Sequence, residues 1–332
     1  MDYNGSIMKM LVLGTAVAFI VTWGASVLLI RFQRVLPWMD HPNARSSHRV
    51  PKPRSGGVAI AAALLLAAGC GKFWSGAVAG AAAGFFLLGL CDDWRPLPEV
   101  FRLAVQVALA WFAVHLEGRE VGFIGLPWPP ELSLHGEALA VFWIVGFVNI
   151  FNFMDGIDGY ALGKVVMGGL ALFWLGGAPN LMVTAAAAGG LLLLNFPPSR
   201  IFLGDGGSYL LGFLLAEACL VRLPSVPFIV VVMPFSSFLL DECLTLSRRL
   251  ISGEKWYKAH RSHYYQRAVA LGLTHLQVTL CDYCLTAAGA LAAIIYLRAT
   301  TLRERAAIML GLCLALVLPI FAVGAAERHQ AR

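Results

Sequence analysis

The chain has 332 residues, of which 59% are hydrophobic and 13% charged, with a formal net charge of +6 and a mean hydropathy of +0.74. This composition is far more apolar than that of soluble globular domains, so it excludes a soluble protein, and no nucleic-acid-binding module is recognisable. The sequence therefore predicts an all-α, polytopic integral membrane protein.

Apolar segments of membrane-spanning length follow one another along the whole chain. A hydrocarbon core about 30 Å thick needs about 20 apolar residues per helix. Ten or eleven helices are predicted in one membrane domain, 1–332, since some segments are short and no soluble domain interrupts them. The first segment is too long, and is followed by too many others, to be a cleaved signal peptide. The candidates cover residues 7–30, 56–71, 74–91, 101–116, 138–151, 161–176, 180–196, 208–221, 226–246, 278–297 and 306–323.

The distribution of basic residues predicts the orientation, because loops rich in Lys and Arg stay in the cytoplasm. Placing the N-terminus outside puts 18 of the 25 Lys and Arg residues on the cytoplasmic side. Three arginines in and beside the last loop dissent: Arg298, Arg303 and Arg305. A basic cytoplasmic face would also attract anionic membrane lipid. The predicted cytoplasmic segments are 31–55, 92–102, 152–164, 197–207, 247–267 and the C-terminus.

Two adjacent aspartates, Asp92 and Asp93, follow the apolar run GAAAGFFLLGLC. A single aspartate here would be read as a solvated helix end. Two neighbouring carboxylates repel each other, and a cation or a proton relieves the repulsion. The pair therefore favours a functional site.

The motif NIFNFMDGIDG covers residues 149–159 at the end of another apolar segment. Asn149, Asn152 and Asp155 are three residues apart, so they share one helical face about 120° wide. Glycines then free the backbone, which lets Asp158 fold back toward the same place. Helix capping is the alternative, but one such residue is enough for a cap.

The motif GDGGS, which contains Gly204 and Asp205, opens the eighth predicted helix. Its glycines would let backbone N–H groups approach an anion at a helix N-terminus. The carboxylate of Asp205 would repel a bound anion unless Mg²⁺ lies between the two. Mg²⁺ binds one or two carboxylates together with phosphate oxygens. Taken alone, the motif is more often a tight turn.

Two basic loops contain histidines and face the same predicted side. Histidines near a phosphate donate hydrogen bonds or move protons, and Lys and Arg neutralise its charge. A solvated positive loop is an equally good interpretation of each loop alone. The candidates are Arg45, His48, Lys52 and Arg54 in the first loop and His260, Arg261 and His263 in the second.

Five motifs in this order resemble the polyprenyl-phosphate N-acetylhexosamine-1-phosphate transferases, the glycosyltransferase 4 family that includes the phospho-N-acetylmuramoyl-pentapeptide transferase. They are SHRVPKPRSGG, LLGLCDDW, NIFNFMDGIDG, FLGDGGSYLLG and HRSH. The resemblance covers nearly the whole chain. The resemblance implies transfer of a sugar 1-phosphate from a UDP-sugar to undecaprenyl phosphate, with Mg²⁺, or Mn²⁺ in its place, and release of UMP. A lipid-linked sugar diphosphate for an envelope glycan such as O-antigen would be the product, made at the bacterial inner membrane, and a homodimer is compatible.

The resemblance also implies roles for the motif residues. Asp205 would bind Mg²⁺, and Asp92, with Asp93 beside it, would deprotonate or orient the lipid phosphate. Asp155, His260 and His263 complete the predicted catalytic set. The predicted substrate-binding residues are Arg45, His48, Lys52, Asn149, Asn152, Asp158, Gly204 and Arg261.

The sequence departs from the family pattern at two positions. The family's histidine motif is often HxHH, whereas Ser262 takes the place of its middle histidine, which argues against the muramoyl-pentapeptide enzyme itself. A lysine commonly follows the aspartate pair after two residues, and here the position holds Pro96.

Two other classes of protein remain compatible with the residues alone. A cation-coupled transporter also uses membrane carboxylates, although it would place them near the middle of the membrane on broken helices. An aspartate-rich membrane prenyltransferase also binds Mg²⁺ diphosphate, but it would need paired aspartates four residues apart. Substrate uptake by vesicles, or release of inorganic diphosphate rather than UMP, separates these classes from the predicted transferase.

Overall fold

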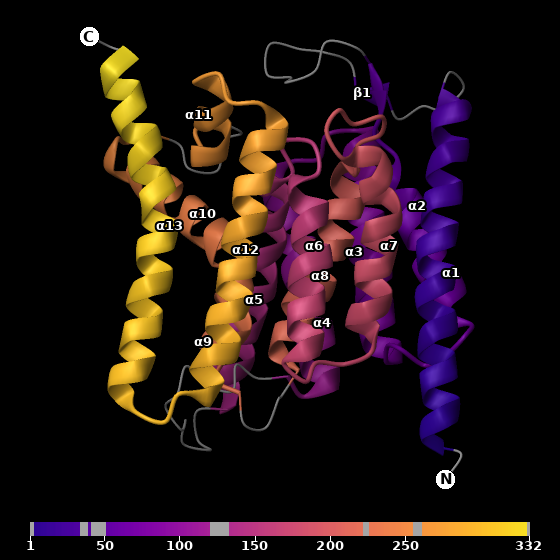
Figure 1. Cartoon of the computed structure of the whole chain (residues 1–332). Helices are drawn as coiled ribbons and strands as arrows, with labels where there is room; N and C mark the ends of the chain where they lie inside the picture. Colours follow the sequence, from indigo (N-terminus) through magenta and orange to yellow (C-terminus); the bar gives the residue numbers. More distant parts are fainter. Residues whose placement is uncertain are drawn as a thin grey trace. The chain divides into compact units, whose positions relative to one another are not determined.

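The computed structural model describes residues 3–33, 39–40, 51–119, 133–221, 226–254 and 261–330. Over these residues its regular secondary structure is helical except for one antiparallel pair of two-residue strands, β1 (Met39–Asp40) and β2 (Lys52–Pro53). The chain divides into two compact units, Met1–Phe228 and Ile229–Arg332, coloured from indigo to rose and from orange to yellow in Figure 1. The predicted all-α class is confirmed. That the units work as one membrane domain stays a prediction.

The helices follow the apolar segments of the sequence. The first unit contains α1 (Tyr3–Arg31), α2 (Gly56–Ala68), α3 (Gly76–Trp94), α4 (Glu99–Glu117), α5 (Ser133–Met154), α6 (Tyr160–Trp174), α7 (Asn180–Asn195) and α8 (Gly204–Leu220). From the boundary onward follow α9 (Phe228–Val232), the 3₁₀ helix η3 (Met233–Phe235), α10 (Ser236–Ile251), α11 (Tyr264–Ala270), α12 (His275–Arg298) and α13 (Leu302–Gln330).

Seven helical stretches in the described part of the chain are long and apolar enough to cross a membrane. They are Ser6–Arg31, Gly76–Trp94, Glu99–Glu117, Gly136–Met154, Phe228–Ile251, His275–Arg298 and Leu302–Gln330. Three shorter apolar helices, α2, α6 and α7, also coincide with predicted spans. The protein is therefore a multi-pass membrane protein, as the composition predicts.

Local signals explain where the helices around the polar loops begin and end. Ser75 caps α3 by accepting a hydrogen bond from the N–H of Val78. The helix stops at Trp94 because Pro96 disfavours a helical conformation at Arg95, the residue before it. Helix α4 ends at Gly118, whose φ of 58° is left-handed, as is usual after a helix C-terminus.

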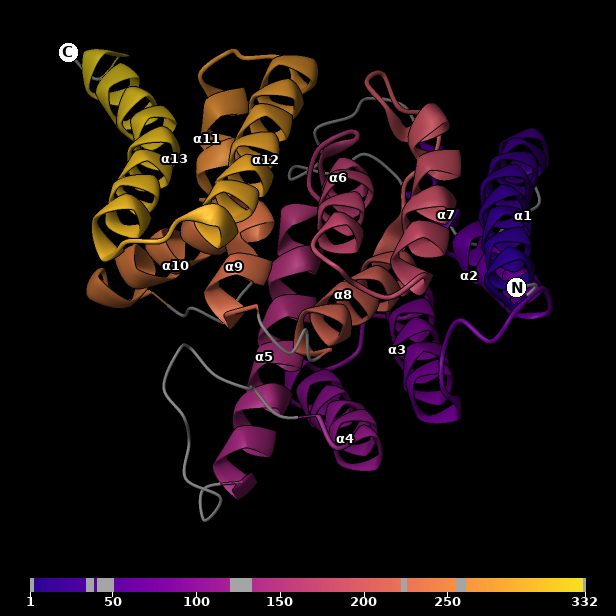
Figure 2. The same cartoon turned by 60° about the horizontal axis from the view of Figure 1, so that its bottom comes forward.

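Helix α8 lies in the middle of the first unit, between α5 and α3 in the view of Figure 2. Glycines make this close packing possible. A Cβ on Gly57 of α2 would lie 2.3 Å from the backbone nitrogen of Gly207, and one on Gly89 of α3 would lie 2.2 Å from the carbonyl oxygen of Asp205. Small residues commonly mediate such backbone contacts between membrane helices. The first turn of α8 is thus fixed by two neighbouring helices.

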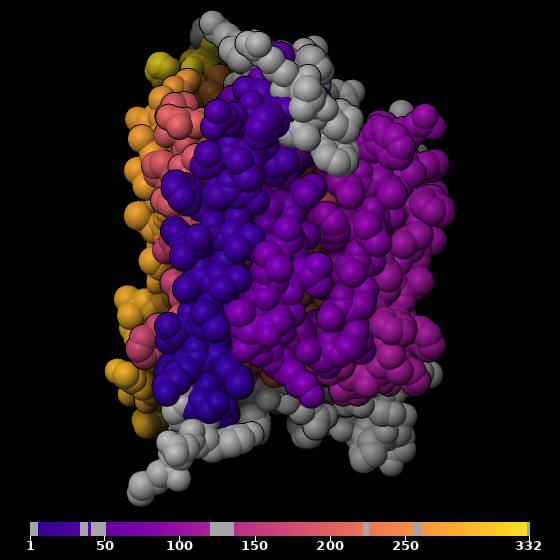
Figure 3. Space-filling view, turned by 90° about the vertical axis from the view of Figure 1, so that its right-hand side faces the viewer, coloured from indigo at the N-terminus to yellow at the C-terminus, as the bar shows by residue number. Residues whose placement is uncertain are grey.

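The outer surface of the first unit is apolar. Figure 3 shows the face on which α1, in indigo, runs beside α2, α3 and α4 in purple. Large apolar side chains of these helices are exposed, among them Ile20 and Val12 on α1 and Val100 on α4. Such a surface fits contact with lipid, whose chains solvate apolar side chains.

The second unit is held together by its own contacts. Helix α12 begins with a capping box, in which Thr274 and Gln277 exchange hydrogen bonds. A Cβ on Gly289 of α12 would lie 2.2 Å from the carbonyl oxygen of Met233, so α12 packs directly on η3. Arg267 of α11 forms an ion pair with Glu327 of α13. Helix α11, at Tyr264–Ala270, is the one helix of this unit that the sequence did not predict.

Candidate active site

The polar loops of the first unit meet at one end of its helices. The N–H of Phe202 donates to the carbonyl oxygen of Pro53 at 2.9 Å, and the N–H groups of Gly56 and Gly57 donate to Phe202 and Leu203 at 2.9 and 2.8 Å. These bonds tie β2 and the start of α2 to the segment before α8. The SGG sequence at 55–57 therefore packs on α8 and its backbone binds protein carbonyls. The glycines at 56 and 57 therefore have a packing role in this structure.

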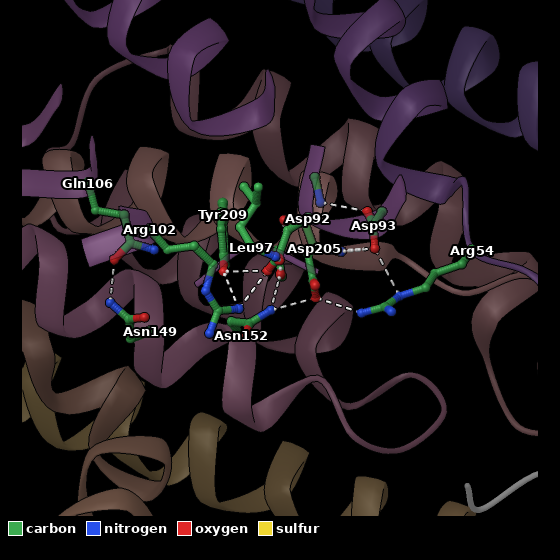
Figure 4. Close-up of polar contacts among 12 residues, drawn as sticks. Arg54, Asp92, Asp93, Leu97, Arg102, Gln106, Asn149, Asn152, Asp205 and Tyr209 are labelled. Atoms are coloured by element: carbon green, nitrogen blue, oxygen red, sulfur yellow. Dashed lines mark hydrogen bonds and ion pairs between the residues drawn. The ribbon is translucent and has the colours of Figure 1, made fainter. Parts of the chain in front are cut away.

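Asp93 connects the end of α3 to the start of α8. Its Oδ1 accepts the N–H of Asp205 at 3.0 Å, and its Oδ2 accepts the N–H of Gly206 at 2.9 Å (Figure 4). The free amides at a helix N-terminus attract an anion, and here that anion is a carboxylate of the protein. Gly204 has a left-handed φ of 78°, which allows the turn that brings these amides to Asp93.

Arg54 joins Asp93 to Asp205. Its Nε lies 2.9 Å from Oδ1 of Asp93, and its Nη2 lies 2.7 Å from Oδ1 of Asp205. Burial disfavours the charged guanidinium, but the carboxylates of Asp205 and Asp93 outweigh it and raise the pKa of Arg54. Asp93 lies 112 residues before Asp205 and 39 residues after Arg54 in the chain, yet the two carboxylates and the cation form one cluster.

Asn152 completes this cluster from α5. Its Nδ2 donates to Oδ1 of Asp205 at 2.9 Å and to Oγ of Ser208 at 2.8 Å. Asn149, one turn earlier, instead donates to Oε1 of Gln106 on α4 at 2.7 Å. The two asparagines lie on the same face of α5, as their spacing predicts, but they contact different neighbours.

Asp92 lies next to the cluster and is 6% exposed. Its Oδ1 accepts the N–H of Leu97 at 2.7 Å, and its Oδ2 accepts Nη1 of Arg102 at 2.5 Å and the Tyr209 hydroxyl at 3.4 Å. The carboxylate is therefore already surrounded by three donors. Arg102 was not predicted from the sequence, although an arginine within an apolar helix is itself a signal for function.

Asp155 and Asp158 are only three positions apart in the sequence, but they have different surroundings. Asp158 accepts both the N–H and the hydroxyl of Ser199, at 3.0 and 2.8 Å, and Lys52 donates to that hydroxyl at 2.9 Å. Asp155 follows α5 directly. Loss of solvent raises the pKa of the Asp155 carboxyl well above its usual value; Arg54 opposes this shift, while Asp205, Asp93 and Asp158 add to it.

The donor set of the cluster suits Mg²⁺ brought in by a phosphate ligand. No group of three or more His, Cys, Asp or Glu side chains in the described residues is arranged to hold a metal alone. Mg²⁺ needs fewer protein ligands, because it binds one or two carboxylates and completes its octahedron with water and phosphate oxygens. Within the described residues, Oδ2 of Asp205 accepts no hydrogen bond, and this side chain is 18% exposed.

The predicted histidine site lies in the second unit. His263 is 1% exposed, and its Nδ1 lies 3.5 Å from both Asp241 and Glu242 of α10. The carboxylate of Asp241 also accepts the N–H groups of Tyr264 and Tyr265 at 2.9 and 3.1 Å. Arg261 is exposed. His260, Arg45 and His48 lie outside the described residues.

These features define a class of multi-pass membrane protein that has a cluster of carboxylates, an arginine and amides at one end of its helices. Such a cluster suits an enzyme that acts on phosphate substrates. Comparison with known proteins gives the family. A profile described as glycosyl transferase family 4 matches residues 75–222.

Curated relatives extend this match over most of the chain. A "Probable undecaprenyl-phosphate N-acetylglucosaminyl 1-phosphate transferase" of Bacillus subtilis is 31% identical over 86% of this chain and 85% of its own. A "Decaprenyl-phosphate N-acetylglucosaminephosphotransferase" of Mycobacterium tuberculosis is 28% identical over 89% and 84%. A "Phospho-N-acetylmuramoyl-pentapeptide-transferase" of Thermoanaerobacter is 29% identical over 65% and 77%.

The chain belongs to glycosyl transferase family 4 and is a phosphoglycosyl transferase. The family predicted from the five motifs is confirmed. The transporter and prenyltransferase alternatives are thereby excluded.

Proposed function

We propose that this enzyme transfers an N-acetylamino sugar 1-phosphate from a UDP-sugar to undecaprenyl phosphate, releasing UMP. The observation that carries the proposal is the cluster of Asp93, Arg54, Asp205 and Asn152, which collects charged and amide groups from four separate segments. The names of the Bacillus and Mycobacterium relatives support N-acetylglucosamine as the sugar and a polyprenyl phosphate as the acceptor.

Asp205 is the principal protein ligand of Mg²⁺ in this proposal, with Asn152 beside it. Bound Mg²⁺ would neutralise the diphosphate of the UDP-sugar and the developing charge on the leaving UMP. Asp93 keeps Asp205 in place through the first amides of α8. Asp155 lies close enough to sense the charges of Asp205 and Asp93, and it contributes a second carboxylate at the metal side of the cluster.

Asp92 orients the acceptor rather than removing its proton. Each of its oxygens already accepts a hydrogen bond, from Leu97 or from Arg102. These bonds fix the direction of the carboxylate beside the cluster, which suits a positioning role. A lipid phosphate that is already ionised needs no base, so direct attack by its oxygen on the sugar-bearing phosphorus fits these contacts.

The remaining predicted residues bind substrate. Lys52 and Asp158 are fixed by Ser199, which leaves the Lys52 ammonium two further N–H donors for a ligand. Asn149 and Gly204 belong to the nucleotide and metal region in this proposal. Arg45, His48, His260, Arg261 and His263 bind phosphate groups, with His263 held by α10.

The cluster is proposed to face the cytoplasm, where UDP-sugars are found. This orientation follows from the excess of Lys and Arg in the loops on that side. Single cysteines introduced at the exposed positions Arg95 and Lys72 test it, because these lie in loops at opposite ends of α3. Labelling of position 72 but not 95 by an impermeant reagent in intact cells supports the orientation, and the reverse pattern inverts it.

The reaction is tested with the purified full chain in detergent. Undecaprenyl phosphate, Mg²⁺ and a panel of UDP-sugars are added in turn, and UMP and the lipid product are measured. One N-acetylamino sugar should give UMP and a lipid-linked sugar diphosphate in equal amounts. Because the product starts a glycan, an envelope polysaccharide such as O-antigen is the proposed destination. Absence of UMP with every sugar would refute the proposed substrates.

A further inference from the structure

Arg54 binds both Asp205, the proposed metal ligand, and Asp93, which keeps Asp205 in place. Its Nε and Nη2 each contact one carboxylate, at 2.9 Å from Asp93 and 2.7 Å from Asp205 (Figure 4). This fork geometry uses a planar guanidinium that bridges two anions. One cation therefore neutralises the repulsion between Asp93 and Asp205 within the protein itself.

A metal ion and Arg54 compete for the same carboxylate. Oδ1 of Asp205 already accepts Nη2 of Arg54 and Nδ2 of Asn152. Mg²⁺ approaches its oxygen ligands to about 2.0–2.1 Å and brings two positive charges. A guanidinium held 2.7 Å from Oδ1 would repel an ion bound at the neighbouring Oδ2 of the same carboxylate, so metal binding favours withdrawal of Arg54.

Arg54 is placed where it is able to move. Its side chain is 37% exposed, whereas that of Asp93 is 3% exposed, and it precedes α2 in the short segment after β2. Within the described residues, its Nη1 makes no hydrogen bond. A diphosphate offers a guanidinium charged oxygens in place of the carboxylates that it leaves.

We propose that Arg54 is a displaceable counter-cation, a positioning residue that holds Asp93 and Asp205 ready and yields to a divalent ion that arrives with a diphosphate. The inference rests on the proposed function, because it takes Asp205 as the metal ligand. Arg54 thereby makes metal binding depend on nucleotide binding. Metal alone must displace Arg54 without compensation, whereas metal with a UDP-sugar gives the guanidinium a new anionic partner.

The test measures Mn²⁺ binding to the full chain in detergent by electron paramagnetic resonance, without lipid phosphate, so that no turnover occurs. For Arg54→Gln we expect Mn²⁺ affinity without nucleotide to rise at least about fivefold, because the competing cation is gone. In the wild type, UDP-N-acetylglucosamine should raise Mn²⁺ affinity by about 10-fold or more, a usual size for coupled sites. In Arg54→Gln this enhancement should shrink to about twofold.

Arg119→Gln is the matched control. Arg119 makes a comparable ion pair with the buried Glu217, whose Oε1 lies 3.1 Å from Nε and 2.9 Å from Nη2 of the arginine. Glu217 lies near the end of α8, whereas Asp205 lies in its first turn. Loss of Arg119 should leave Mn²⁺ affinity unchanged. Arg54→Lys, which keeps the charge but not the fork, should give an affinity between those of the wild type and Arg54→Gln, and it provides the test should Arg54→Gln not fold.

The outcomes separate the two proposals. Mn²⁺ binding to Arg54→Gln and Arg54→Lys that is equal to or weaker than that of the wild type overturns the role of Arg54. Asp205→Asn should bind Mn²⁺ at least 10-fold more weakly. If Asp205→Asn binds Mn²⁺ as the wild type does, the proposed metal ligand is wrong, whatever the Arg54 variants show.

Discussion

Replacing Gly89 by alanine should damage the cluster without touching any of its polar residues. Gly89 lies on α3, one turn before Asp93, and faces the first turn of α8. An alanine Cβ there would lie 2.2 Å from the carbonyl oxygen of Asp205 and 2.6 Å from the nitrogen of Gly206. Ordinary contacts begin near 3.4 Å, so α3 and α8 must separate by about 1.2 Å at this point.

That separation is large enough to break the bonds between the helices. Asp93 accepts the N–H groups of Asp205 and Gly206 at 3.0 and 2.9 Å, so both bonds would lengthen to about 4 Å, beyond the range of a hydrogen bond. Overpacking of this kind costs about 1–3 kcal/mol of stability. A displacement of about 1 Å at a catalytic group costs about 100-fold in rate.

UMP release and the thermal unfolding midpoint in detergent measure the two effects on Gly89→Ala. Gly80→Ala is the control on the same helix, because its Cβ would lie 3.8 Å from the nearest atom, in the side chain of Phe112. Gly80→Ala should keep its activity and gain up to about 1 kcal/mol, since alanine favours helix over glycine. Wild-type activity and stability in Gly89→Ala would show that this contact does not position Asp205.

Three further predictions test other parts of the site. Asp155→Asn should be more stable than the wild type near pH 8 and equal to it well below pH 4, as measured by thermal unfolding. Burial raises the pKa of the Asp155 carboxyl, so its ionisation costs the folded state; this cost is absent in acid, grows as pH rises above the usual pKa of an aspartate, and is complete once the raised pKa is passed. A stability difference that does not change with pH would contradict this. Asp92→Asn should lower turnover at least 100-fold and stability by about 1 kcal/mol, because Arg102 and Leu97 lose a charged acceptor; a variant with normal UMP release would remove Asp92 from the site. His263→Ala should reduce turnover far more than Ser262→Ala, because His263 is buried against Asp241 and Glu242, whereas an alanine at 262 keeps the carbonyl that Arg248 binds at 2.6 Å; equal losses would mean that the histidine motif is misaligned.

The helices were predictable because each depends on a local property of the sequence. A membrane helix needs a long apolar run, and every predicted span overlaps a helix of the structure. Helix α11 was missed because YYQRAVA is short and mixed in character, and its start is fixed by Asp241, 23 residues earlier. Its position thus depends on tertiary contacts that no local pattern reports.

The polar residues were predictable as a group, but their partners were not. Asp93, Asn152 and Asp205 belong to recognisable motifs, so the sequence brings them into one candidate site. That Asp93 binds the first amides of α8 depends on contacts across 112 residues. Ser199 and Arg102 stand alone in their segments, so no repeated spacing marks them, although each holds a predicted aspartate.

The glycines show how one pattern serves two purposes. GDGGS and SGG have the composition of phosphate-binding loops, in which missing side chains let a ligand approach the backbone. The same absence lets two helices touch, and here Gly57 packs on Gly207. The sequence alone does not separate these uses, since both require only that no Cβ be present.

UMP release by purified wild type and Asp205→Asn, measured across a range of Mg²⁺ concentrations with undecaprenyl phosphate and the preferred UDP-sugar, tests the proposed reaction most directly. The wild type should release UMP only when lipid phosphate, UDP-sugar and Mg²⁺ are all present. Asp205→Asn should lose at least 100-fold in rate, because the amide keeps the size of the side chain but removes the charge that binds Mg²⁺. A variant that keeps both the wild-type rate and its Mg²⁺ dependence would contradict the assignment of the cluster as the metal-dependent active site.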